Sequence, residues 1–213
     1  MGVFELSGHH GQTIYLVRHG ETESAFPRPL IGQKDVDLGC KGLEQARKLA
    51  EQFKDLNIAA IYCSDLKRSY ATAKIVAEAL GQELAVCSEL REVNLGDWDG
   101  LTKDEIRAQF PHQWEQRGED FECYRPKGGE SFADLRDRVI PFFCEVLADA
   151  KKPAIIIGHA GVNRVILCCV LGMPLSHLFR LSQDFGAVNI IEFREENFRV
   201  SAMNCRRPIS PTV

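Results

Sequence analysis

Short apolar runs alternate along this sequence with longer segments in which apolar residues recur every three or four positions. The short runs predict buried strands, and the longer periods predict amphipathic helices. Strands are expected at 14–17, 58–63, 83–87, 154–157, 188–193 and 198–203, and helices at 40–56, 65–80, 102–110, 131–150 and 162–171. This alternation predicts an α/β protein, a three-layer α-β-α sandwich whose central sheet has about six mostly parallel strands.

Two serines stand where helices are expected to begin. Ser64 precedes the helix at 65–80 and is expected to cap its N-terminus. Ser131 is followed three residues later by Asp134, a pair that resembles a capping box. Gly81 is expected to end the first of these helices, because glycine readily adopts the left-handed conformation found there.

Two polar stretches are expected to lack regular structure. Residues 1–12 form a Gly-containing leader that is expected to be loosely ordered, with His9 and His10 in solvent rather than on a metal. Residues 111–129 are expected to make an irregular excursion over the functional site and to contact whatever is attached to a bound anion. Because the sequence has no internal repeat and no clear linker, residues 1–213 are expected to form one domain.

Composition narrows the class of protein. A net charge of −4 over 213 residues argues against a general nucleic-acid-binding protein. The N-terminus lacks the apolar segment of a secretory signal, and the longest apolar stretch, 165–175, is too short to span a bilayer. Eight cysteines without a C-x-x-C pair favour buried reduced thiols in a cytoplasmic protein, with a metal site or a disulfide framework as the alternative.

The first candidate for chemistry is the end of the apolar run 14–17, which leads directly into Arg18, His19 and Gly20. Open α/β sheets bind ligands at the carboxyl ends of their strands, so these residues are expected to line a ligand crevice. Arg18 offers a planar fork that fits phosphate oxygens. His19 can act as a nucleophile if a neighbour holds one ring nitrogen and leaves the other free.

The run 154–157 leads in the same way into His159, and the backbone N–H groups of Ala160 and Gly161 could add donors for an anion. Arg68 lies in the first turn of the helix that follows another expected strand, and helix N-termini also bind anions. A lone histidine at a strand end would more often be a structural residue, and a lone arginine a surface residue. Two histidines and two arginines after strand ends instead indicate one phosphate site.

Glu92 lies in a run of charged residues, glycines and a tryptophan at 90–100 that is expected to form a loop. It is the candidate proton donor, because a carboxylic acid can protonate a leaving alkoxide. The alternative is a surface ion pair with the neighbouring Arg91.

Five blocks of the sequence resemble, in order, the motifs of the histidine phosphatase (phosphoglycerate mutase-like) superfamily. The blocks are Arg18-His19-Gly20-Glu21-Thr22, Ser64 to Arg68 with Thr72-Ala73, Leu90-Arg91-Glu92 to Gly100, Gly128-Gly129-Glu130-Ser131, and Gly158-His159-Ala160-Gly161. The ordered set spans roughly residues 13–195 and is much more specific than any one block. The stretches 158–164 and 183–189 look most like the α-ribazole phosphatase branch and related broad-specificity phosphatases.

The resemblance implies a role for each candidate residue. His19 would be the phosphorylated nucleophile, and Glu92 would act as general acid and then as general base. His159 would be a third catalytic residue, holding the phosphoryl oxygens together with the substrate-binding Arg18 and Arg68. Ala160 is a further candidate for substrate binding, through its backbone N–H. The substrate would be a small-molecule phosphate ester, and neither a metal nor another cofactor would be required. Ala25 and Gly39 depart from the family pattern, which often has a phosphate-binding Asn and a hydroxyl residue there.

Three functions follow as alternatives. The favoured one is a phosphomonoesterase for a small metabolite, with α-ribazole 5′-phosphate as a candidate substrate. The second is a cofactor-dependent phosphoglycerate mutase, although such mutases usually carry longer segments than this chain has room for. The third is a non-catalytic module that binds a phosphorylated ligand, and the presence of His19 and Glu92 argues against it. The strand and helix near the C-terminus could form the contact of a homodimer.

Overall fold

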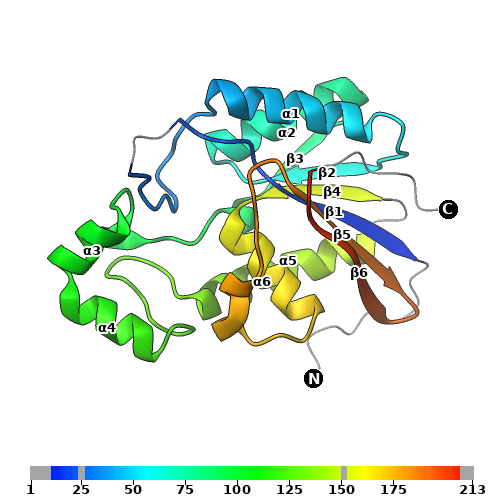
Figure 1. The fold of residues 1–213 in the computed structure, drawn as a ribbon. Coiled ribbons are helices and arrows are strands. Elements are labelled where there is room, and N and C mark those ends of the chain that lie inside the picture. The colour runs from blue at the N-terminus through cyan, green and yellow to red at the C-terminus, as the bar shows by residue number, and fades with distance from the viewer. Residues whose placement is uncertain (1–10, 24–26, 150–152, 207–213) are drawn as a thin grey trace.

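A six-stranded sheet forms the centre of the computed structural model, which describes residues 11–23, 27–149 and 153–206 (Figure 1). In spatial order the strands are β3 (Leu84–Val86), β2 (Ala60–Cys63), β4 (Ala154–Gly158), β1 (Gln12–Arg18), β5 (Val188–Arg194) and β6 (Asn197–Cys205). The first four are parallel, whereas β5 is antiparallel to β1, and β6 is antiparallel to β5. The predicted mostly parallel sheet is therefore confirmed.

Helices cover both faces of this sheet, as predicted (Figure 1). One face carries α1 (Cys40–Phe53) and α2 (Lys67–Leu80), and the other carries α5 (Phe132–Asp149) and α6 (Ala160–Val170). The shorter helices α3 (Lys103–Gln109) and α4 (Pro111–Glu119) lie to one side of the sheet in Figure 1. Single turns of 3-10 helix occur at Ser88–Leu90 and Gly96–Trp98, and a longer one at Leu175–Arg180.

Strand β1 shows why a continuous apolar run in the sequence predicts a strand of the central sheet. Ile14 and Leu16 pack into the cluster that includes residues of α5 and α6, and Tyr15 and Val17 pack into the cluster that includes α1 and α2. A strand that is buried on both faces has no polar side, so its sequence is a continuous apolar run.

Two predicted helix boundaries are confirmed by their capping geometry. Gly81 ends α2 with a left-handed φ of 62°. The hydroxyl of Ser131 accepts a hydrogen bond from the backbone N–H of Asp134 (3.0 Å), and the Asp134 carboxylate accepts one from the N–H of Ser131 (2.9 Å). This reciprocal pair is a capping box with aspartate in place of the usual glutamate.

Several expectations about irregular segments were wrong. Gln12, assigned to the leader, belongs to β1 and pairs with Phe193 of β5. The segment 111–129 contains α4, which begins at Pro111, a position where the missing N–H of proline costs the helix nothing. His9 and His10 lie outside the described residues.

The cysteines are less uniformly buried than predicted. Cys63 and Cys168 are buried, but Cys40 and Cys123 are exposed. None of the helices in the described ranges has both the length and the apolar character needed to cross a membrane. In the same ranges, no group of three or more His, Cys, Asp or Glu residues is arranged to hold a metal ion.

Candidate active site

The two candidate histidines meet because β1 and β4 are neighbouring parallel strands. Arg18 and Gly158 are partners in the strand register, so His19 and His159 leave the sheet side by side. Their ring centroids are 5.0 Å apart, and both side chains are almost completely buried. Residues separated by about 140 positions in the sequence thus share one site at the carboxyl edge of the sheet.

The hydrogen bonding of His19 fixes which nitrogen is free. Its Nδ1 lies 2.7 Å from the carbonyl oxygen of Gly20. A carbonyl can only accept, so Nδ1 carries the proton and Nε2 keeps its lone pair. Burial, and then the charges of Arg18 and Arg68, hold the pKa of His19 well below its ordinary value of 6.5. The ring is therefore neutral near pH 7, as a nucleophile must be.

The two predicted arginines flank this ring and are themselves held by the backbone. Arg18 donates to the carbonyl of Gln183 (2.5 Å) and lies over the ring of Phe185, with 3.6 Å between the guanidinium carbon and the ring centroid. Burial lowers the pKa of Arg18 to about 10, so the guanidinium stays charged at neutral pH. Arg68 donates to the carbonyls of Gly32 (2.6 Å) and Lys34 (3.0 Å). Its side chain is buried, which excludes the alternative of a surface arginine.

His159 is held by the hydroxyl group of Ser64. Ser64 was expected to cap α2, but Leu66 occupies that position, and Ser64 Oγ instead lies 2.7 Å from His159 Nε2. His159 Nδ1 is buried and has no hydrogen-bond partner among the described residues. Burial, and then the proximity of His19, keep the pKa of His159 well below its ordinary value.

Glu92 approaches the histidine pair from the loop that follows β3, and it is only 8% exposed. Its carboxylate accepts hydrogen bonds from the backbone N–H groups of Gly161 (3.0 and 3.1 Å) and Val93 (2.9 Å). A Cβ at Gly161 would lie only 2.3 Å from Glu92 Oε1, so this approach requires glycine. The N–H of Gly161, expected to face an anion, therefore binds Glu92.

The alternative role for Glu92, an ion pair with Arg91, is wrong. Arg91 instead forms an ion pair with Asp65, which lies just before α2. Successive side chains of an extended loop point in different directions, so Arg91 and Glu92 face different surroundings.

A pocket of about 640 Å³ opens over these groups. Of the six predicted site residues, five line it: Arg18, His19, Arg68, Glu92 and Ala160. His159 is fully buried and stacks edge-on against His19. The segment 111–129 contributes side chains to the pocket wall, among them Trp114, Arg117, Phe121 and Tyr124.

The pocket also has lining residues that were not among the predicted site residues. Arg164 stands one helical turn after Ala160 in α6, so helix periodicity could have identified it. Phe185 packs against both Arg18 and His19, and Trp98 stacks on Tyr124 with ring centroids 5.5 Å apart. Both aromatic residues lie in stretches that resemble the family, Trp98 in 90–100 and Phe185 in 183–189, but hydrophobic periodicity alone does not distinguish them from core residues.

Besides Arg18 and Arg68, the pocket is lined by Arg117 and Arg164, so it carries more positive charge than one phosphoryl group requires. Arg164 uses its Nε to donate to the carbonyl of Leu181 (2.8 Å), and Arg117 lies over the ring of Phe121, 4.5 Å from its centroid. Within the described part of the chain, neither arginine forms an ion pair with a carboxylate. Both guanidinium groups are available to a second anionic group on a ligand.

The buried histidines predict how stability depends on pH. The pKa values of His19 and His159 are lower in the folded chain than in the unfolded chain, so the unfolded chain binds protons more tightly. The stability contributed by these neutral rings is complete above pH 6.5 and is lost as the pH falls below it, by about 1.4 kcal/mol per pH unit for each group. We expect His159→Asn to reduce the fall in Tm between pH 7 and 5, measured by calorimetry. The same substitution at the exposed His112 serves as the control. If Tm falls with pH equally steeply in both variants, the prediction is wrong.

Comparison with known proteins gives one consistent result. A family model described as "Histidine phosphatase superfamily (branch 1)" matches residues 14–206. The glucosyl-3-phosphoglycerate phosphatase of Mycolicibacterium vanbaalenii is 32% identical over 175 residues, which cover 77% of this chain and 76% of that protein. The "Probable phosphoglycerate mutase GpmB" of Salmonella choleraesuis is 31% identical over 190 residues, or 88% of each chain. The crystal structure of the α-ribazole phosphatase from Shigella flexneri superimposes with a TM-score of 0.86 and 24% identity over 94% of this chain and 100% of that one, which supports the fold.

Proposed function

The chain belongs to the histidine phosphatase superfamily, and we propose that it hydrolyses small phosphate monoesters through a phosphohistidine formed on His19. The observation that carries this proposal is a neutral imidazole with a free Nε2, held beside the buried Arg68 and the half-buried Arg18 and next to a carboxyl group in the same pocket. A nucleophile, phosphoryl-binding cations and a proton donor are the groups that phosphoryl transfer needs.

In the first proposed step, the lone pair of His19 Nε2 attacks phosphorus and the P–O bond to the leaving group breaks. The leaving oxygen takes the proton of the Glu92 carboxyl group, so the product is a neutral alcohol. Charge on the phosphoryl oxygens is stabilised by Arg18 and Arg68, and by an N–H of His159. Because these groups are fixed before the substrate arrives, little reorganisation is needed during the reaction.

In the second step, water attacks the phosphorus of phosphohistidine and gives a proton to the Glu92 carboxylate. The P–N bond breaks, inorganic phosphate leaves, and His19 Nε2 regains its lone pair. Glu92 is protonated again, so the cycle closes with one water consumed. Both steps use only side chains of this protein and water.

The pocket walls favour two classes of leaving group. Aromatic side chains such as Trp114, Phe121 and Tyr124 would pack against a flat base, which suits the candidate substrate α-ribazole 5′-phosphate. Arg117 and Arg164 would instead bind a carboxylate, as in a phosphoglycerate, and a relative at 32% identity is named for a glucosyl-3-phosphoglycerate.

A panel of phosphate esters tests the proposal and separates these classes. We expect phosphate release that resists EDTA from at least one of p-nitrophenyl phosphate, α-ribazole 5′-phosphate, 3-phosphoglycerate and phosphoserine. The matched pair 3-phosphoglycerate and glycerol 3-phosphate differs mainly in a carboxylate, and a preference for the former by about tenfold or more would assign the two arginines to it. No release from any ester by a folded protein would contradict hydrolysis. Turnover that requires a bisphosphorylated primer would favour the mutase alternative.

A further inference from the structure

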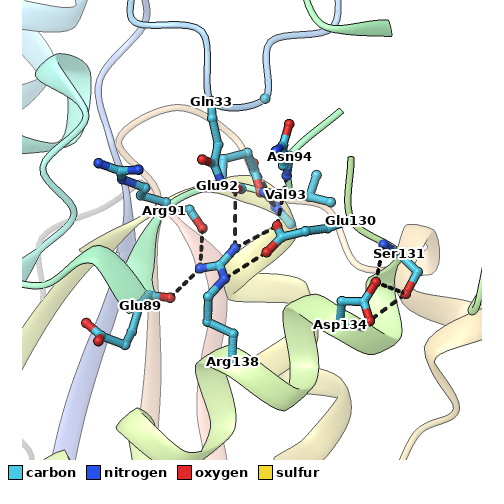
Figure 2. A network of polar contacts seen from close by, with 12 residues as sticks. Gln33, Glu89, Arg91, Glu92, Val93, Asn94, Glu130, Ser131, Asp134 and Arg138 are labelled. Carbon is cyan, nitrogen blue, oxygen red and sulfur yellow. Dashed lines mark hydrogen bonds and ion pairs between the residues drawn. The ribbon is translucent and has the colours of Figure 1, made fainter. Parts of the chain in front are cut away.

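Arg138 of α5 uses its guanidinium group to bind the loop that carries Glu92 and the neighbouring Glu130 (Figure 2). One terminal nitrogen donates to the carbonyls of Glu89 (2.6 Å) and Arg91 (3.1 Å). The other donates to the carbonyl of Glu92 (3.5 Å) and to the carboxylate of Glu130 (2.8 Å), which also accepts from Nε (3.0 Å). These contacts number five, and an arginine has five N–H groups, so the donor capacity of Arg138 is filled.

Glu130 and Gln33 hold the same loop from two other directions. The Glu130 carboxylate accepts from the N–H of Asn94 (2.9 Å), and its own backbone N–H donates to the Asn94 carbonyl (2.8 Å). The side-chain amide of Gln33 donates to the carbonyl of Glu92 (3.1 Å). Figure 2 shows these groups converging on residues 89–94 from separate segments. The backbone is thus fixed both before and after Glu92.

We propose that Arg138, paired with Glu130, is a positioning residue that sets the Glu92 carboxyl group at the distance required for proton transfer. The inference rests on the proposed function, because it assigns Arg138 a role in that reaction. Residues 91–95 have no regular secondary structure of their own, so contacts with α5 replace it. A proton donor acts only within hydrogen-bond reach of the leaving oxygen, and a displacement of about 1 Å can cost a factor of about 100 in rate.

Arg138 stands behind the pocket rather than in its wall. Arg138 does not line the pocket, whereas Arg18 and Arg68 do. A lysine at position 138 would keep the charge but could not reach the three carbonyls and both oxygens of Glu130 at once, because it lacks the planar fork. The proposed role therefore depends on the shape of the guanidinium group.

The test compares Arg138→Gln with Arg136→Gln. Arg136 lies on the same helix and is also ion-paired, to Glu122 and Asp137, but within the described residues it forms no hydrogen bond or ion pair with residues 89–92. The quantity compared is kcat/KM, which reports the first step alone and not the hydrolysis of phosphohistidine that both esters share. We expect Arg138→Gln to lower kcat/KM about 100-fold for a poor leaving group, such as the glycerol of glycerol 3-phosphate. For p-nitrophenyl phosphate, whose leaving group needs little protonation, kcat/KM should fall by less than about threefold. Arg138→Lys should recover only part of the loss, and Arg136→Gln should behave as wild type.

An equal loss of kcat/KM for both esters would overturn the proposal, because a merely structural defect does not depend on the leaving group. Amide hydrogen exchange gives a readout without catalysis. We expect the N–H groups of Val93 and Asn94 to exchange faster in Arg138→Gln but not in Arg136→Gln, and unchanged exchange would also overturn the positioning role. A wild-type protein that cleaves no phosphate ester of the panel would contradict the proposed function itself, and the exchange result would still decide whether Arg138 fixes the loop.

Discussion

Replacement of His19 by alanine is expected to lower turnover of every phosphate ester by roughly 10⁴-fold or more, because the variant cannot form the covalent intermediate. The fold should survive, since His19 lies at the end of β1 and its side chain faces the pocket. The loss is measured as release of inorganic phosphate under saturating substrate. Rapid quenching after mixing with a ³²P-labelled ester should give labelled protein for the wild type and none for the variant.

The chain offers a matched control for this experiment. His112 is exposed in α4 and does not line the pocket, so His112→Ala should keep both turnover and labelling. Residual activity of His19→Ala near the wild-type level would show that another group, or water directly, attacks phosphorus. Label that persists in His19→Ala would place the covalent phosphate on a different residue.

Replacement of Glu92 by glutamine is expected to slow alkyl phosphate hydrolysis by about 10²- to 10⁴-fold, because glutamine cannot donate the proton. The amide keeps an oxygen that can accept from the N–H groups of Val93 and Gly161, so the local structure should be retained. With p-nitrophenyl phosphate the first step should remain fast. Hydrolysis of phosphohistidine still needs a base, so labelled phosphoenzyme should accumulate in this variant and can be measured after rapid quenching.

Glu89→Gln is the control for this variant, since Glu89 lies three residues earlier and its side chain is exposed. We expect Glu89→Gln to hydrolyse both classes of ester as the wild type does. If Glu92→Gln slows alkyl and aryl esters equally and no phosphoenzyme accumulates, Glu92 is neither the general acid nor the general base.

The sequence by itself determined the layered fold and most of the candidate residues. Both depend on patterns that lie close together along the chain. A strand buried on both faces must be a continuous apolar run, so β1 and β4 were visible as 14–17 and 154–157. Residues that directly follow such runs lie at the carboxyl edge of a parallel sheet, which is why His19 and His159 could be assigned to one site.

The tertiary structure decided which partner each of these residues has. Ser64 binds His159 rather than capping a helix, and the N–H of Gly161 binds Glu92 rather than facing an anion. Arg138 fixes the loop of Glu92 from a helix more than 40 residues away. Hydrogen bonds of this kind depend on distances of a few tenths of an ångström between segments that are remote in sequence. Local periodicity carries no information about such distances, which arise only when the layers pack.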